Sequence, residues 1–238
     1  MNPTVASLTA STLLGKRRAL LLFVLPGLLL ALAVLVRTTV GPDDGLTKAV
    51  LGSFGMSPLV PLLGLIIGTG VIGAEIDDGS IVYLLSKPLP RWVIVVTKLV
   101  VAIGCIAVFV AIPMLVSGLL ISGLSEGLAA GYFWGALIGG TAYSALFLWL
   151  AVVSRHAVII GLIYALVWES LVGAYVPGAR TLSIQQWALS VAGEVAVEGE
   201  VESAVSFGVG AVLLAVVIIG ATALACVKLR SLTLVEAD

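Results

Sequence analysis

The chain has 238 residues and a formal net charge of −1; 61% of its residues are hydrophobic and only 11% are charged. Because soluble globular domains carry about 25% charged residues, this composition excludes an ordinary soluble enzyme or binding domain and indicates an integral membrane protein. A spanning helix needs about 20 apolar residues, so we expect one all-helical transmembrane domain over residues 1–238, with six spans and short connections.

The N-terminal segment, residues 1–18, is predicted to be an amphipathic helix that lies on the membrane surface. It is rich in Ser and Thr, it has a weak apolar face made by leucines, and it ends in the basic cluster Lys16, Arg17 and Arg18. Such a cluster anchors a helix at the lipid headgroups. A secretory signal peptide also combines basic residues with an apolar core. Here, however, the basic residues begin only at Lys16, and no convincing cleavage site follows the apolar run.

Apolar runs, separated by turn residues and charges, predict the six membrane spans. The connections hold turn clusters, such as the Gly-Pro-Asp-Asp-Gly segment that begins at Gly41. The spans are expected at residues 19–36, 54–76, 93–121, 132–153, 157–175 and 203–227.

The segment between the fifth and sixth spans, residues 180–202, is polar and contains four glutamates. Apolar residues surround Trp187, but Gln185 and Gln186 argue against a full span. We therefore expect a re-entrant segment, a short helix that dips into the outer leaflet.

The basic residues predict the orientation of the chain in the membrane. If the N-terminus is inside, the inside segments hold nine of the twelve Lys and Arg residues. Because cytoplasmic loops carry the excess of Lys and Arg, we expect both termini and the loop at residues 77–91 to be cytoplasmic. The expected location is the plasma membrane, as a multi-pass protein.

Residues 73–98 carry six charged side chains between two long apolar runs. Within them a Gly-Ser pair suits the end of one helix and the start of another, and two prolines end the short segment that follows. Spacings of three and four place Ile81, Leu84 and Leu85 on one helical face. We expect a short helix across the cytoplasmic mouth of the protein; an ordinary loop is the alternative. The residues assigned to this element are Glu75, Asp77, Asp78, Gly79, Ser80, Ile81, Leu84, Leu85, Ser86, Pro88 and Arg91.

Motifs for catalysis and for cofactor binding are missing from the sequence. His156 is the single histidine, which excludes zinc sites built on several histidines. There is no Gly-x-Ser-x-Gly motif for a serine hydrolase. The nearest fragment to a P-loop, Gly15-Lys16, lacks the first glycine and the Ser or Thr. We expect no enzyme activity, metal or cofactor in this chain, so any energy from ATP must come through a partner.

Glycines recur at intervals of four residues in two of the predicted spans. Small residues at this spacing let membrane helices approach closely. The pattern fits either packing within one subunit or a seam between two copies. The glycines concerned are Gly64 and Gly68, and then Gly127, Gly131, Gly135 and Gly139.

Glu169 is the one carboxylate that lies well inside a predicted span. Carboxylates in the membrane are costly and point to a function by default. Two interpretations compete: a proton or substrate site, or a hydrogen-bond partner for backbone where a helix is broken. The neighbouring Tyr164, Trp168 and Ser170 favour the structural role.

The charged stretch resembles the cytoplasmic loop of ABC-2 type transporter permeases. The run from Glu75 through Gly79-Ser80 and Leu84-Leu85-Ser86-x-Pro88 to Arg91 is similar to the acidic residue, Gly-Thr pair, Leu-Leu-Ser-x-Pro and Arg of that family. Ser80 stands where Thr is usual. The arrangement of the whole chain resembles the family too.

This resemblance implies a role for each part. Residues 77–86 would be a coupling helix in a groove of a separate ATP-binding subunit, and residues 1–18 would be a connecting helix that touches the same subunit. Two permeases, here a homodimer, and two ATPases that bind ATP and Mg²⁺ would form the transporter, most often an exporter. The other expected partner is membrane lipid; none is nucleic acid.

Other classes of protein stay open. An ion- or proton-driven secondary transporter could use Glu169, although such carriers show more polar residues in the membrane and an internal repeat. An unpowered membrane scaffold and a membrane enzyme are further alternatives. The transported substrate cannot be read from the sequence, although the apolar spans favour a lipid-like cargo over a small ion.

Overall fold

The computed structural model describes residues 16–77, 90–123, 127–172, 178, 180–197 and 199–235. Every regular element in these ranges is a helix, as the composition predicted. The elements are α2 (Lys16–Thr39), α3 (Asp44–Lys48), η1 (Ala49–Leu59), α4 (Val60–Asp77), α6 (Arg91–Ile106), η2 (Ala107–Ala111), α7 (Ile112–Ile121), α8 (Leu128–Val153), α9 (Ala157–Ile163), η4 (Tyr164–Val172), η5 (Arg180–Leu182), α11 (Ile184–Val195) and α12 (Phe207–Val235).

Within the described residues, five helical stretches are long and apolar enough to cross a membrane. The predicted fifth span, residues 157–175, corresponds to α9 and η4, whose apolar part Ala157–Glu169 is shorter than the other five. The six-span count therefore stays a prediction. The five stretches are Leu20–Thr39, Asp44–Gly73, Arg91–Ile121, Leu128–Val153 and Phe207–Leu229.

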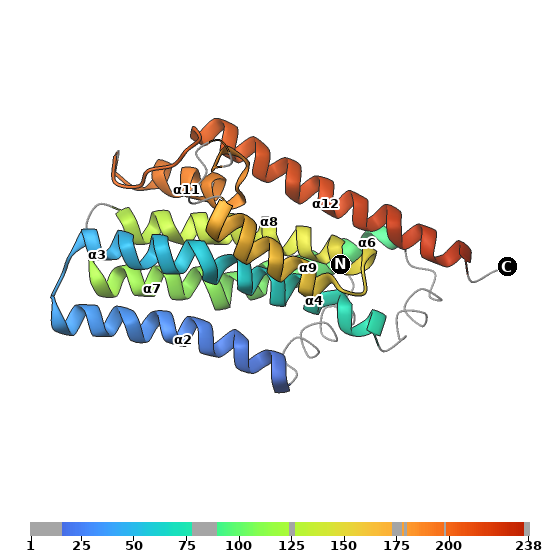
Figure 1. The fold of residues 1–238 in the computed structure, drawn as a ribbon, viewed down its shortest axis with the longest axis horizontal. Coiled ribbons are helices and arrows are strands. Elements are labelled where there is room, and N and C mark those ends of the chain that lie inside the picture. Colours follow the sequence, from blue (N-terminus) through green and yellow to red (C-terminus); the bar gives the residue numbers. More distant parts are fainter. Residues whose placement is uncertain are drawn as a thin grey trace.

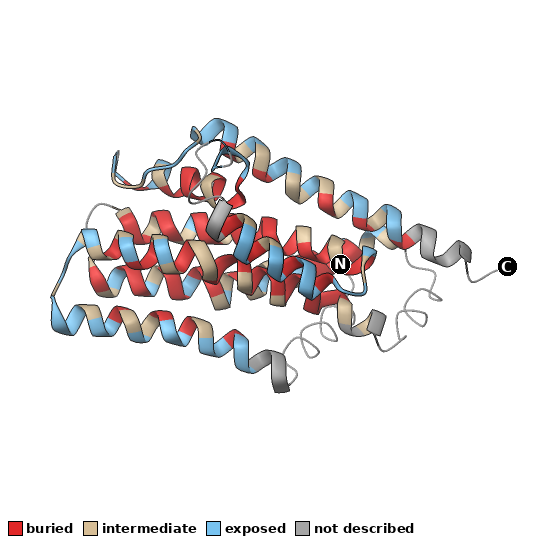
Figure 2. Cartoon of the chain, in the orientation of Figure 1, coloured by how far each residue is buried: buried red, intermediate tan, exposed pale blue. Residues whose placement is uncertain are grey.

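Helix α8 is the centre of the bundle. It packs against α4 and α7 on one side and against α11 and α12 on the other (Figure 1). In its most apolar stretch 67% of the residues are buried, against 22% for each of α2 and α12. The outer faces of α2 and α12 are accordingly exposed (Figure 2), and their apolar side chains are suited to contact with lipid.

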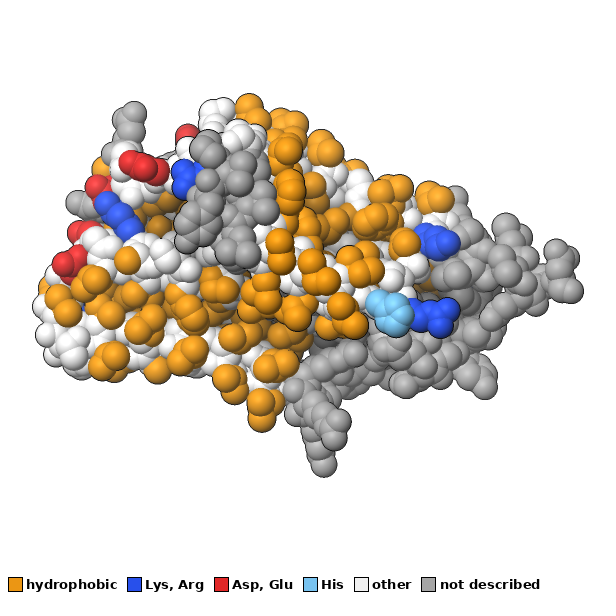
Figure 3. All heavy atoms as spheres, viewed as in Figure 1, with side chains coloured by type: hydrophobic (Ala, Val, Ile, Leu, Met, Phe, Trp, Pro, Cys, Tyr) orange, Lys and Arg blue, Asp and Glu red, His pale blue; other side chains and the backbone are white. Residues whose placement is uncertain are grey.

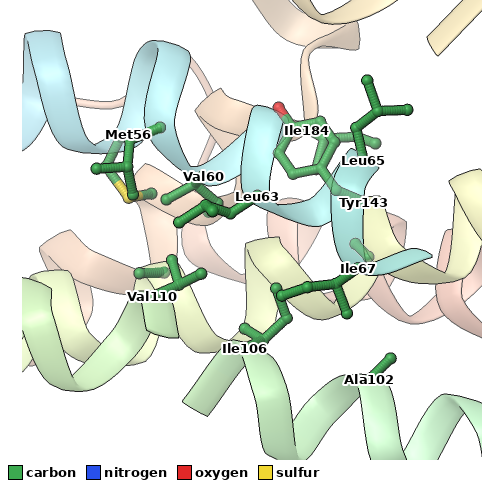
Figure 4. Packing of buried hydrophobic residues seen from close by; sticks show 14 of the residues in the cluster. Met56, Val60, Leu63, Leu65, Ile67, Ala102, Ile106, Val110, Tyr143 and Ile184 are labelled. Atoms are coloured by element: carbon green, nitrogen blue, oxygen red, sulfur yellow. The ribbon is translucent and has the colours of Figure 1, made fainter. Parts of the chain in front are cut away.

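The core lies where α4, α6 and α8 meet. Leu63 and Ile67 of α4, Ile106 of α6 and Tyr143 of α8 are fully buried there, and Figure 4 shows them converging from their separate helices. Spacings of three to four residues bring the α4 side chains onto one face of that helix. The core therefore joins the two helices that flank the predicted cytoplasmic loop to the central helix.

The spaced glycines pack helices within the subunit. A Cβ atom added at Gly68 of α4 would lie 2.6 Å from the Ser144 carbonyl oxygen of α8. A Cβ at Gly131 of α8 would lie 2.5 Å from the carbonyl oxygen of Ala192 in α11, and Gly135 and Gly139 contact the same helix as closely. Of the two interpretations of this pattern, the structure supports packing inside one chain.

Three of the membrane helices contain π-helical sections, η1, η2 and η4. In η1, Pro58 lies inside the helix; proline lacks an N–H and clashes with the preceding turn, and the wider π turn relieves both problems. Such turns often occur at functional sites. Here η4 carries Glu169, and η1 continues into α4.

Charged side chains collect at the two ends of the molecule, and hydrophobic side chains cover the face between them (Figure 3). The helix α2 begins and α12 ends at the same end of the bundle (Figure 1). This distribution is typical of a protein that crosses a bilayer, with charges in water and apolar side chains in hydrocarbon.

Candidate functional site

Most of the predicted coupling element lies outside the described residues. Helix α4 ends at Asp77 and α6 begins at Arg91, so the structure shows the two ends of this segment. The short helix therefore stays a prediction. The assigned residues outside the description are Asp78, Gly79, Ser80, Ile81, Leu84, Leu85, Ser86 and Pro88.

An ion pair closes the base of this segment. Lys98, in the second turn of α6, is fully buried, and its Nζ donates to Oε1 of Glu75 at 2.7 Å. The same Nζ donates to the backbone carbonyl of Val71 at 2.5 Å, one turn earlier in α4. A buried ammonium without partners would cost several kcal/mol, so these contacts hold α4 and α6 together where the segment leaves the bundle.

The sequence placed both charges in the same stretch but did not pair them. Lys98 was counted there among the six charged side chains of residues 73–98. The available signal was its position: an amine two turns inside an apolar helix needs a carboxylate from a neighbouring helix, and Glu75 is the acidic residue closest to the end of the preceding apolar run.

Glu169 forms the second polar centre, and its carboxylate is fully buried. Oε1 accepts hydrogen bonds from the Tyr164 hydroxyl at 2.9 Å and from the Ile184 N–H at 3.1 Å. Oε2 accepts from the Ser183 hydroxyl at 2.5 Å and from the Gln185 N–H at 3.4 Å. The carboxylate thus binds the start of α11.

The Glu169 carboxylate gives hydrogen-bond acceptors to backbone N–H groups at the start of α11. The first N–H groups of any α-helix have no partner within it, and a negative charge at that end is favourable. Ser183 is the N-cap of α11, and its side-chain oxygen also accepts from the Gln186 N–H. Glu169 therefore fixes α11 from one end, while close packing against the α8 glycines fixes it along its length.

The region predicted to be re-entrant contains α11 and the irregular segment that follows it. Trp187 is buried, and its indole N–H donates to the Thr181 carbonyl at 2.8 Å. The Ala204 N–H donates to Oε1 of Gln186 at 3.0 Å, which ties the segment before α12 back to α11. This part of the chain is a helix docked on α8, with both neighbouring segments held to it.

The basic cluster at Lys16, Arg17 and Arg18 falls in the first turn of α2. Of the connecting helix predicted over residues 1–18, residues 1–15 lie outside the described part of the chain, so this helix stays a prediction. No group of His, Cys, Asp and Glu side chains in the described ranges is arranged to hold a metal ion.

One stretch of the chain contains α4 and α6, which flank residues 78–89, and most of α11, which Glu169 holds. This stretch is similar to a known protein family. A family model described as ABC-2 family transporter protein matches residues 20–192. The chain belongs to the ABC-2 transporter family. The match covers α2 through most of α11, so it includes both polar centres, and it makes the chain a multi-pass membrane subunit of the ABC transporter permease type. A search of curated proteins found no relative that matches the chain.

Proposed function

We propose that this ABC-2 protein is the permease subunit of an exporter and that a separate ATP-binding subunit drives it. Family membership implies a partner of this kind. The partner would bind ATP and Mg²⁺, because the sequence has no P-loop of its own. The observation that carries the proposal is the Lys98–Glu75 ion pair, which joins the two helices on either side of the predicted coupling segment.

The ion pair explains how the segment at residues 78–89 would act on the membrane helices. If α4 and α6 were not joined to each other, a force on the segment between them could move one helix without moving the other. Because Lys98 contacts both Glu75 and Val71, a push on the segment displaces α4 and α6 together. Both helices pack on α8, so the displacement reaches the centre of the bundle.

The complete transporter in this proposal contains two copies of the permease and two ATPases in the plasma membrane. The segment at residues 77–91 and both termini would face the cytoplasm. The charge distribution supports this orientation: Arg155, His156 and Lys228 lie at the end where α8 finishes, whereas the opposite end holds Asp43 and Asp44 among its acidic residues.

The test is ATP hydrolysis by the purified permease, with and without an ATP-binding subunit that is expressed with it. The permease alone should show none, and the complex should hydrolyse ATP and export in reconstituted vesicles. Hydrolysis by the isolated permease, or export that follows a proton gradient with no ATPase present, would contradict the proposal.

A further inference from the structure

A polar pocket of about 620 Å³ opens at the end of the bundle opposite the Lys98–Glu75 pair. Its walls are formed by the helices α3, η1, α8, η5 and α11 and by the segment around residue 200. Charged side chains gather at this end of the molecule (Figure 3). The lining residues that matter here are Lys48, Tyr132, Arg180, Gln185, Glu200 and Glu202.

Tyr132 is the clearest sign that the pocket takes a ligand. Its side chain is only 3% exposed, and its hydroxyl has no hydrogen-bond partner among the described residues. A Cβ atom added at Gly52 would lie 3.3 Å from that hydroxyl oxygen, so the glycine keeps the space above it open. The hydroxyl is therefore the polar tip of an otherwise buried side chain at the pocket wall, where it can donate a hydrogen bond to a polar ligand.

Among the described residues that line the pocket, two cations and two carboxylates balance. Lys48 and Glu200 form an ion pair at 2.5 Å on its rim. Arg180 supplies a second cation, whose planar fork of five N–H donors is suited to phosphate. Glu202 supplies a second carboxylate, and it is exposed, with no described hydrogen bond or ion pair. A ligand that carries both a negative and a positive group matches this lining better than a purely anionic one.

We propose that the pocket binds the headgroup of a zwitterionic phospholipid of the phosphoethanolamine type. The phosphate accepts from the Arg180 guanidinium and the Tyr132 hydroxyl, and the ammonium donates to Glu202. Tyr132 lies near the start of the apolar stretch Leu128–Val153, so the pocket lies where this stretch meets the charged end, which is the depth of lipid headgroups. The exposed Leu182 is close in sequence to Arg180, where it can contact the hydrocarbon.

The test is a binding titration of the purified full-length chain in detergent with short-chain phosphatidylethanolamine and phosphatidylglycerol, followed by native mass spectrometry. We expect one saturable phosphatidylethanolamine site with about tenfold preference over phosphatidylglycerol. Tyr132→Phe should weaken it about tenfold, the effect of one hydrogen bond to a charged group. Glu202→Gln should abolish the preference. Asp44→Asn, a change at the same end but outside the lining, should leave binding unaltered.

A Gly52→Ala variant and a competition experiment with a chain-free headgroup test the same site independently. Gly52→Ala retains every polar group but closes the space over the hydroxyl, so it should weaken binding as Tyr132→Phe does, with unchanged thermal stability. Glycerophosphoethanolamine, the headgroup without acyl chains, should compete weakly. Equal binding of the two lipids, normal binding by Tyr132→Phe and Glu202→Gln, or a chain-free headgroup that binds as tightly as the lipid would each overturn the assignment to a lipid headgroup.

Discussion

The Nζ of Lys98 and Oε1 of Glu75 lie 2.7 Å apart and join α6 to α4 directly behind the predicted coupling segment. The lysine side chain is completely buried and the glutamate side chain is 17% exposed. Removing one member of a buried pair leaves an uncompensated charge, whereas an apolar replacement of both members can be nearly neutral. The pair therefore makes a specific energetic prediction.

Lys98→Met and Glu75→Leu should each destabilise the protein by about 3 kcal/mol, while the double substitution should cost much less than the sum. The measurement is thermal or denaturant unfolding of the four proteins in detergent. The control is the rim pair Lys48 and Glu200, whose side chains are 36% and 24% exposed; Lys48→Met should cost less than about 1 kcal/mol. Additive costs at Lys98 and Glu75 would show that the two residues are energetically independent.

The apolar face of the predicted coupling segment should be needed for assembly or for transport. Truncation of a buried interface anchor can cost about 2 kcal/mol or more, whereas a solvated loop tolerates change. We therefore expect Leu84→Ala combined with Leu85→Ala to leave membrane insertion intact. It should weaken co-purification of the ATP-binding subunit or uncouple its ATP hydrolysis from transport.

The matched control for this double variant is Asp43→Asn combined with Asp44→Asn. Asp43 caps α3 by accepting from the Leu46 N–H at 2.8 Å, and asparagine caps helices equally well. The control should assemble and transport normally. A Leu84 and Leu85 variant that matches the parent in both assays would refute the coupling helix.

Glu169→Gln should be tolerated, and Glu169→Leu should lower the yield of folded protein. The amide oxygen can still accept from Tyr164 and the Ile184 N–H, and the amide nitrogen can donate to Ser183, so only the 3.4 Å contact with Gln185 is lost. Leucine would leave the N–H groups at the start of α11 without this acceptor, at about 1–3 kcal/mol for each buried group.

Size-exclusion profiles and a transport assay decide between the two roles of Glu169. Glutamine and the parent should behave alike in both. If Glu169→Gln folds normally but does not transport, the ionised carboxylate takes part in the reaction, and the secondary transporter becomes the better description.

Cysteine labelling should show that position 80 faces the cytoplasm and position 43 faces outside. Cys105 and Cys226, which are partly buried and form no disulfide, are first replaced by serine. A membrane-impermeant maleimide applied to intact cells should then label a cysteine introduced at position 43 and spare one introduced at position 80. Labelling at position 80 from outside would reverse the proposed orientation.

The helical fold was predictable because a helix that crosses a membrane needs a long run of apolar residues, which is easily recognised in the sequence. Apolar runs about 20 residues long indicated the helices, and α8, predicted at residues 132–153, covers Leu128–Val153. The four-residue glycine spacing indicated close contacts, but it could not say between which helices. Only the structure shows that Gly131 of α8 approaches Ala192 of α11 rather than a second copy.

The polar sites were less predictable because their partners are distant in the sequence. Lys98 binds a carboxylate 23 residues away, and hydrophobic periodicity does not specify pairs of this kind. For Glu169 the sequence suggested a backbone partner but not the start of α11, because hydrophobic periodicity does not say which N–H groups will lie beside a buried carboxylate. The pocket at Tyr132 has no signal in the sequence, because its walls come from elements that lie far apart in the chain.

The bonds of Glu169 also constrain how the protein is made. Synthesis runs from the N-terminus, so Tyr164 and Glu169 leave the ribosome before Ser183, Ile184 and Gln185 exist. A carboxylate alone in hydrocarbon is expensive, and of the four groups that donate to it only Tyr164 has been made by then. We therefore expect the segment from α9 to α11 to be integrated as one unit, after the residues at the start of α11 have emerged. Nascent chains that stop between residues 172 and 183 should be integrated poorly, although they already contain every apolar residue of the first arm.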